Sequence, residues 1–164
     1  MIGHRVAFIL LLCSLLIVGP VLAFEGISAG MGLDASGNSA KIAAAGGSLI
    51  LGFEMNPQIA LGLKSTFSYD FNSLTTLEQA GFFRWYPAFK TRGFFLQGEL
   101  GSSIFYDNTI NRLSFMGGLA LGWRFHIKKW FLEPGLRAGY PYIWGAGFTA
   151  GMIFPISHKD LEEK

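Results

Sequence analysis

Few residues in this sequence have the type and spacing that a catalytic site requires. Ser102, Ser103 and Ser114 are conceivable nucleophiles, because a serine hydroxyl attacks an ester once an adjacent general base removes its proton. The reaction that such a serine would support is cleavage or transfer of an acyl group. The folded chain would then also have to bring a base close to one of these serines.

A suitable base is hard to find. After residue 23 the only histidines are His126 and His158. His158 lies in a polar C-terminal stretch and His126 precedes an expected turn at Lys128 and Lys129, so we interpret both histidines as solvated. Two histidines without a matching cluster also make a poor metal site. We therefore predict no catalytic residue, no cofactor and no metal.

Two short motifs resemble functional signatures but stand in the wrong context. GAGFTA at 145–150 matches a dinucleotide-binding pattern, yet it opens no helix and lies within a run of alternating residues. Cys13 is the only cysteine. A lipoprotein site there is an alternative, although a bulky leucine precedes the cysteine and apolar sequence continues beyond it. If export removes Cys13, the mature chain has neither a disulfide nor a thiol ligand.

The composition describes one unusually apolar domain. The chain has 164 residues, of which 51% are apolar and only 15% are charged, whereas about a quarter of an ordinary soluble domain is charged. The formal net charge of +2 is spread thinly, without the Lys/Arg clusters that a binder of phosphate backbones needs. Nucleic acid is therefore not an expected partner.

Residues 1–23 have the order of an export signal. A short positive start at His4 and Arg5 precedes an apolar run over 6–18, and helix breakers come just before the small residue Ala23. An uncleaved membrane anchor is the alternative, because the apolar stretch approaches the length of a span. We expect cleavage after Ala23.

From Phe24 onward, large apolar residues alternate with small or polar ones at a period of two, which is the period of a β-strand. In the clearest run, Leu119 and Leu121 alternate with Gly118, Ala120 and Gly122. We expect eight strands, near 25–34, 43–55, 58–70, 75–87, 93–106, 112–126, 130–140 and 143–154. Each run is about as long as a tilted strand that crosses a bilayer, and an even number lets the sheet close. The predicted fold is all-β: an eight-stranded antiparallel up-and-down transmembrane barrel.

The two faces of the runs indicate which side points outward. A soluble ligand-carrying barrel would turn its large apolar face inward, but the other face here has too few charges to keep a protein dispersed in water. We expect the large apolar face to meet lipid, including Leu61, Leu63, Leu119, Leu121 and Phe148. The small face fills the lumen, so eight strands leave no open channel. Aromatic residues at run ends are expected to form interfacial girdles: Tyr69, Trp85, Tyr106, Trp123, Trp130, Tyr140 and Trp144.

Turn signals separate the runs, including those at 34–38, 70–73, 90–93 and 107–111. An even strand count after an N-terminal signal places both chain ends in the periplasm. The connections near 34–41, 70–76 and 107–111 are then external. We expect them to be slightly longer than the periplasmic turns near Asn56, Lys90 and Lys128.

A cluster of charges is expected inside the lumen. An antiparallel hairpin centred between Ile127 and Trp130 places Arg124 opposite Glu133, with both side chains facing inward. Arginine can give a carboxylate two directed hydrogen bonds when bulk water is excluded. We expect three further lumenal charges to extend this pair: Arg84, Glu99 and Arg137.

The pattern resembles the small outer-membrane barrels of the OmpX type and the transmembrane half of OmpA. The resemblance rests on the signal, the eight runs, the charged lumen and an aromatic-ended last run that closes at Phe154. It implies a barrel over 24–154, a polar tail over 155–164, outer-membrane lipids as surroundings and assembly by the barrel-assembly machinery. In that family the closing aromatic is usually the last residue, whereas ten residues follow Phe154 here.

The same resemblance leaves the role open, because one fold carries several functions in this family. We expect a non-enzymatic barrel with a structural or surface-interaction role and an unknown surface partner. Two alternatives stay open. One is a lipid A or phospholipid-modifying enzyme that uses one of the three serines, and the other is a soluble periplasmic ligand carrier.

Overall fold

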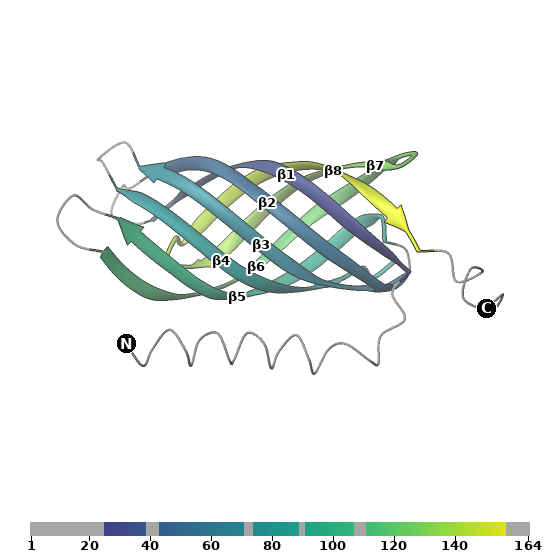
Figure 1. Cartoon of the computed structure of the whole chain (residues 1–164), viewed down its shortest axis with the longest axis horizontal. Coiled ribbons are helices and arrows are strands. Elements are labelled where there is room, and N and C mark those ends of the chain that lie inside the picture. Colours follow the sequence, from purple (N-terminus) through teal and green to yellow (C-terminus); the bar gives the residue numbers. More distant parts are fainter. Residues whose placement is uncertain (1–24, 39–42, 71–73, 89–90, 107–110, 157–164) are drawn as a thin grey trace.

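The computed structural model describes residues 25–38, 43–70, 74–88, 91–106 and 111–156. The expected signal segment with Cys13, His158 and most of the expected C-terminal tail lie outside the described residues. The fold over the described part is a single closed β-barrel (Figure 1).

Eight antiparallel strands form the barrel in sequence order, and β8 pairs with β1 to close it. The strands are β1 (Gly26–Gly37), β2 (Ala43–Asn56), β3 (Ile59–Asp70), β4 (Thr75–Trp85), β5 (Gly93–Tyr106), β6 (Asn111–Ile127), β7 (Trp130–Tyr140) and β8 (Trp144–Pro155). The strands are strongly tilted against the long axis of the barrel (Figure 1). The predicted eight-stranded antiparallel barrel is confirmed. Its last strand ends at Pro155, one residue inside the expected tail.

Alternate residues of each strand face the lumen or the outside of the barrel, as the period-two pattern predicts. On β6 the side chains of Met116 and Arg124 are buried, while Leu119, Leu121 and Trp123 are exposed. A closed sheet has no edge strand, so its backbone N–H and C=O groups are paired between strands and need no water. Large apolar side chains can therefore occupy the outside.

The outward set agrees with the sequence prediction. Leu63, Leu119, Leu121 and Phe148 are between 45% and 73% exposed, and Leu61 lies half-buried on the same face. The seven aromatic residues expected at the strand ends are all exposed. Within the described residues no helix is long and apolar enough to cross a membrane.

Lumenal glycines make room for the rings that fill the barrel. A Cβ on Gly62 would lie 2.4 Å from the ring of Phe82, and one on Gly151 would lie 2.4 Å from the ring of Phe131. Both distances are far below van der Waals contact. The small residues on the inner face therefore have a packing role, because eight strands enclose space only for side chains.

The turn expected at 34–38 is wrong for most of its length. β1 continues to Gly37, and its last residues pair on one side with Ala43–Ala45 and on the other with Trp144–Ala146. Asp34 points into the lumen, where its carboxylate accepts a hydrogen bond from Lys64 Nζ. An aspartate in mid-strand is tolerated here because the lumen supplies a cation.

The turns near Asn56, Lys90 and Lys128 were expected to be shorter than the connections at the other end of the barrel, and this expectation is wrong for the turn near Lys90. The segment between β4 and β5, residues 86–92, is longer than any of the outer connections. Tyr86 turns back into the barrel, is fully buried, and its backbone N–H donates to Gln58 O. The segment therefore covers the end of the lumen instead of forming a tight turn. The other two turns at this end are short, and in one of them Asn56 Oδ1 accepts hydrogen bonds from the N–H groups of Gln58 and Ile59.

Candidate functional site

The most unusual feature of the interior is a layer of paired charges near the end that Tyr86 covers. Arg84 Nη1 donates to Glu133 Oε1 at 2.7 Å, and Arg124 Nε donates to the same oxygen. Arg124 Nη1 also reaches across the lumen to Glu54 Oε1 at 2.6 Å. All four side chains are at most 4% exposed. β2, β4, β6 and β7 are thereby joined through the lumen.

Aromatic rings flank both arginines of this layer. The Arg84 guanidinium lies 4.1 Å from the ring centre of Phe95, and that of Arg124 lies 4.6 Å from the ring centre of Phe131. Both arginines also lie near a second ring, that of Phe82 for Arg84 and that of Tyr86 for Arg124. Cation–π attraction strengthens as water is excluded. The rings therefore stabilise the two cations and also close this end of the lumen.

A chain of hydrogen bonds extends the network toward the other end. Arg84 Nε donates to Gln97 Oε1 and Gln97 Nε2 donates to Glu99 Oε1, each at 2.7 Å. Arg137 then forms an ion pair with Glu99, Nε to Oε2 at 3.4 Å, and donates a hydrogen bond from Nη1 to Glu78 Oε2 at 2.7 Å. The charges thus form one connected network along the lumen.

The part of the lumen toward the β1–β2 connection is less tightly filled. Lys64 Nζ lies 3.0 Å from Asp34 Oδ1, and a cavity of about 60 Å³ lies between this pair and the Arg84 layer. A water occupies about 30 Å³ in the liquid, so the cavity is large enough for roughly two. At this end of the barrel, Tyr142 is buried and its hydroxyl lies 3.0 Å from Thr76 Oγ1. The cavity is therefore small and lined mainly by polar and charged side chains.

The structure brings together all five charged residues that the sequence analysis selected for the lumen, Arg84, Glu99, Arg124, Glu133 and Arg137. The register on either side of the Arg124 and Glu133 positions is the expected one, with Phe125 opposite Leu132 and Gly122 opposite Gly135. Sequence reasoning missed Glu54, Glu78 and the pairing of Asp34 with Lys64. Their signal was available, because each of them has the parity of the small residues on its strand.

The serines and histidine do not form a catalytic arrangement. Ser103 is fully buried in the lumen, whereas Ser102 has the opposite parity on β5. Ser114 is the β6 partner of Ser103 in the register. His126 lies at the far end of β6, beside the backbone of Thr91. Among the described residues no group of His, Cys, Asp and Glu side chains has the arrangement of a metal site.

Comparisons with known proteins bear on the fold. Neisserial surface protein A has a solved structure that matches 80% of this chain and 96% of its own, with a TM-score of 0.54 and 9% identity. This fold is that of the small outer-membrane barrels. The N-terminal β-barrel domain of Pseudomonas aeruginosa OprF matches 77% of this chain and 97% of its own, with a TM-score of 0.49 and 14% identity.

At such low identity the small outer-membrane barrels inform the fold of this chain and not its role. No protein-family model and no curated protein matches the sequence. The two faces of the barrel are therefore the features of this chain that bear on its function.

Proposed function

We propose that this chain is exported and spans the bacterial outer membrane as an eight-stranded barrel formed by one chain. We propose that its role is structural or one of surface interaction, without enzymatic activity. The observation that carries the proposal is the inverted distribution of side chains. Paired charges occupy the lumen, and leucine, phenylalanine and tryptophan cover the outside. Only a lipid environment makes such a surface favourable over a whole barrel wall.

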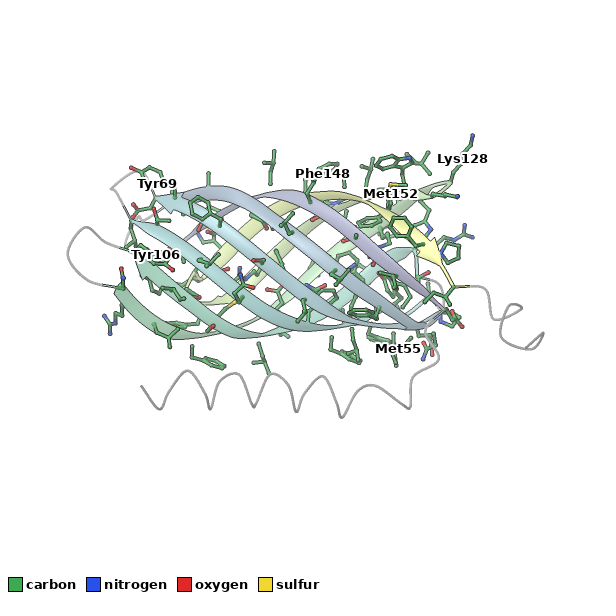
Figure 2. The ribbon with its side chains drawn as sticks, in the orientation of Figure 1. Met55, Tyr69, Tyr106, Lys128, Phe148 and Met152 are labelled. Atoms are coloured by element: carbon green, nitrogen blue, oxygen red, sulfur yellow. The ribbon has the colours of Figure 1, made fainter. Side chains whose placement is uncertain are left out.

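The bands on the outside support the membrane orientation of the barrel. Tyr69 and Tyr106 lie near one end of the barrel, and Lys128 lies at the other (Figure 2). Leucines such as Leu63 and Leu119 lie between the ends of their strands and are well exposed. The exposed Trp85 and Trp130 lie at the strand ends on the side of Lys128. Aromatic rings at both ends with an aliphatic zone between them are the outer surface that a membrane barrel requires.

The alternative of a soluble ligand carrier is poorly supported. A carrier needs an apolar cavity inside and a polar outside. The main lumenal cavity of the described barrel is small and lined by charged side chains such as Lys64, Glu78 and Arg137. We therefore propose that outer-membrane lipids surround the barrel and that the barrel-assembly machinery inserts it.

The test is cell fractionation with an electrophoretic mobility assay. We expect the protein in the outer-membrane fraction, migrating as a compact species before heating and as an extended chain after it. Recovery in the soluble periplasmic fraction would contradict the membrane proposal.

The enzymatic alternative has its own test, which is mass spectrometry of lipid A and phospholipids from cells with and without the protein. We expect identical acyl patterns. Loss of one acyl chain only when the protein is present would overturn the non-enzymatic proposal, and Ser103→Ala and Ser114→Ala would then identify the nucleophile.

A further inference from the structure

One end of the barrel carries most of the exposed charge that the structure describes. Of the exposed charged side chains within the described ranges, Arg92, Lys128, Lys129 and Glu25 are at the end where β1 begins and β8 ends, and Arg112 is at the other end. This end therefore has three exposed cations and one exposed carboxylate among the described residues. The lumenal carboxylates are engaged with lumenal cations.

The three cations belong to neighbouring connections. Gly93 pairs with Arg124 in the β5–β6 register. The β4–β5 connection, which carries Arg92, therefore ends beside the last residues of β6. His126 of β6 lies beside the backbone of Thr91, so these two segments are close to each other. Lys128 and Lys129 follow immediately, and Lys128 extends beyond the barrel end in Figure 2. We call Arg92, Lys128 and Lys129 the basic rim.

A hollow lies in the outer wall over β5, β6, β7 and β8, the strands next to the basic rim. It measures about 470 Å³. Its floor includes the small outward residues Pro134 and Ala146, and its walls include Phe94, Trp123 and Leu136. The hollow is almost wholly apolar, because the residues around it are aliphatic, aromatic or glycine. Such a lining accepts a hydrocarbon chain and no polar group.

The spacing of the rim and the hollow matches one lipid molecule. A tilted barrel strand rises about 2.5 Å along the membrane normal per residue. Trp123 at the hollow therefore lies about 13 Å from Lys128 at the rim, which is close to the depth of one leaflet of a hydrocarbon core of about 30 Å. A phosphate at the rim and an acyl chain in the hollow can belong to the same molecule.

We propose that the basic rim and the hollow over β5–β8 form a binding site for an anionic phospholipid, whose phosphate lies at Arg92, Lys128 and Lys129. This inference rests on the proposed membrane insertion. With both chain ends in the periplasm, the site faces the inner leaflet of the outer membrane. Clustered Lys and Arg at a membrane surface select anionic head groups through charge, and Trp130, which directly follows Lys129, anchors the interface.

The four tryptophans of the chain allow a direct test. In a Trp85→Phe, Trp144→Phe background, Trp123 and Trp130 report on the proposed site. The full chain is folded into phosphatidylcholine vesicles that contain an equal fraction of either chain-brominated phosphatidylglycerol or chain-brominated phosphatidylcholine. We expect the brominated phosphatidylglycerol to quench the emission more strongly, because the site concentrates it next to the two rings.

Variants then separate the rim from the hollow. Arg92→Gln, Lys128→Asn and Lys129→Gln together should abolish the preference, with each cation contributing about fivefold. Asparagine is chosen at 128 because Lys128 has a φ of 58°, which asparagine tolerates. Ala146→Leu should reduce quenching by the anionic lipid while the cations remain. Arg112→Gln, which removes a cation from the other end, should change nothing.

The outcomes distinguish this inference from the membrane proposal. Equal quenching by the two brominated lipids, or a preference that survives the triple change, would mean that the site does not exist although the barrel inserts. The absence of quenching by either lipid would mean that the barrel does not insert, and both proposals would fail.

Discussion

At Glu133 a single carboxylate oxygen accepts hydrogen bonds from Arg84 and Arg124. Each arginine has a further carbonyl or carboxylate partner, Gln97 for Arg84 and Glu54 for Arg124. Because the lumen excludes bulk water, each buried charge depends on its partners to offset the free energy of desolvation. Removal of one member should therefore affect more than one interaction.

The first prediction concerns this coupling. Arg124→Leu and Glu133→Leu should each reduce the free energy of unfolding by about 3–5 kcal/mol, because the first takes the cation from buried Glu54 and the second takes the carboxylate from buried Arg84. The double variant should lose clearly less than the sum of the two. Reversible urea unfolding in lipid vesicles measures all three changes.

The control for this cycle is Arg112→Leu, which removes an exposed arginine from the same strand and should change the free energy of unfolding by less than about 0.5 kcal/mol. Additive losses in the cycle would mean that Arg124 and Glu133 are stabilised independently.

A second prediction uses two glycines that differ only in the face they occupy. Gly151→Ala should destabilise the barrel by about 1–3 kcal/mol, because the new methyl would lie 2.3 Å from Ala29 O and 2.4 Å from the Phe131 ring. Gly98→Ala should be nearly neutral, since nothing lies within 4 Å of its added Cβ. Equal losses in the unfolding free energy would contradict the lumenal packing described above.

At the same scale, the sequence identifies lumenal residues but not all of their partners. The parity of Arg124 and Glu133 and the short turn between them predict that these two face each other. The contact between Arg124 and Glu54 joins residues 70 positions apart. It depends on the tilt and stagger of the whole barrel, which no single strand encodes.

At the scale of the strand, β6 offers the clearest test of the lipid-facing surface. Leu121→Arg should lower the free energy of unfolding by about 2–4 kcal/mol, because a charge near the membrane midplane is penalised most. Ile127→Arg, on the same face at the end of the strand, should cost only about 0–1 kcal/mol. Unfolding in vesicles measures both, and a Leu121→Arg change without effect would show that this face does not contact lipid.

The strands were predictable because alternation is a local property, while two connections were not. Residues 34–37 have turn-forming types, but neighbouring strands on both sides pair with them and Lys64 pairs with Asp34. The segment 86–92 has turn residues too, yet Tyr86 enters the lumen and its backbone N–H donates to Gln58 O. In both places a partner distant in sequence outweighs the local preference.

At the scale of the whole molecule, closure links the strand pattern to the charge network. Arg84 on β4 and Arg124 on β6 both meet Glu133 on β7, and Arg124 also meets Glu54 on β2. The contacts of Arg84 with Glu133 and of Arg124 with Glu54 cross the lumen and form only once the sheet has curled. The strands follow an up-and-down order, so consecutive strands are paired and β1 with β8 is the one pair of strands that are far apart in the sequence. This order explains why closure could be predicted from the sequence.

The orientation of the barrel follows from the same order and gives the last prediction. Chain ends on one side place the β6–β7 turn in the periplasm and the start of β6 outside. Lys129→Cys and Asn111→Cys report on these two ends, and both positions are exposed. A membrane-impermeant maleimide applied to intact cells should label position 111 and leave position 129 unlabelled until the outer membrane is opened. The unsubstituted chain is the control: Cys13 is its only cysteine, so it should remain unlabelled if export removes residues 1–23. Labelling at 129 but not at 111 in intact cells would reverse the orientation and would move the basic rim to the outer leaflet.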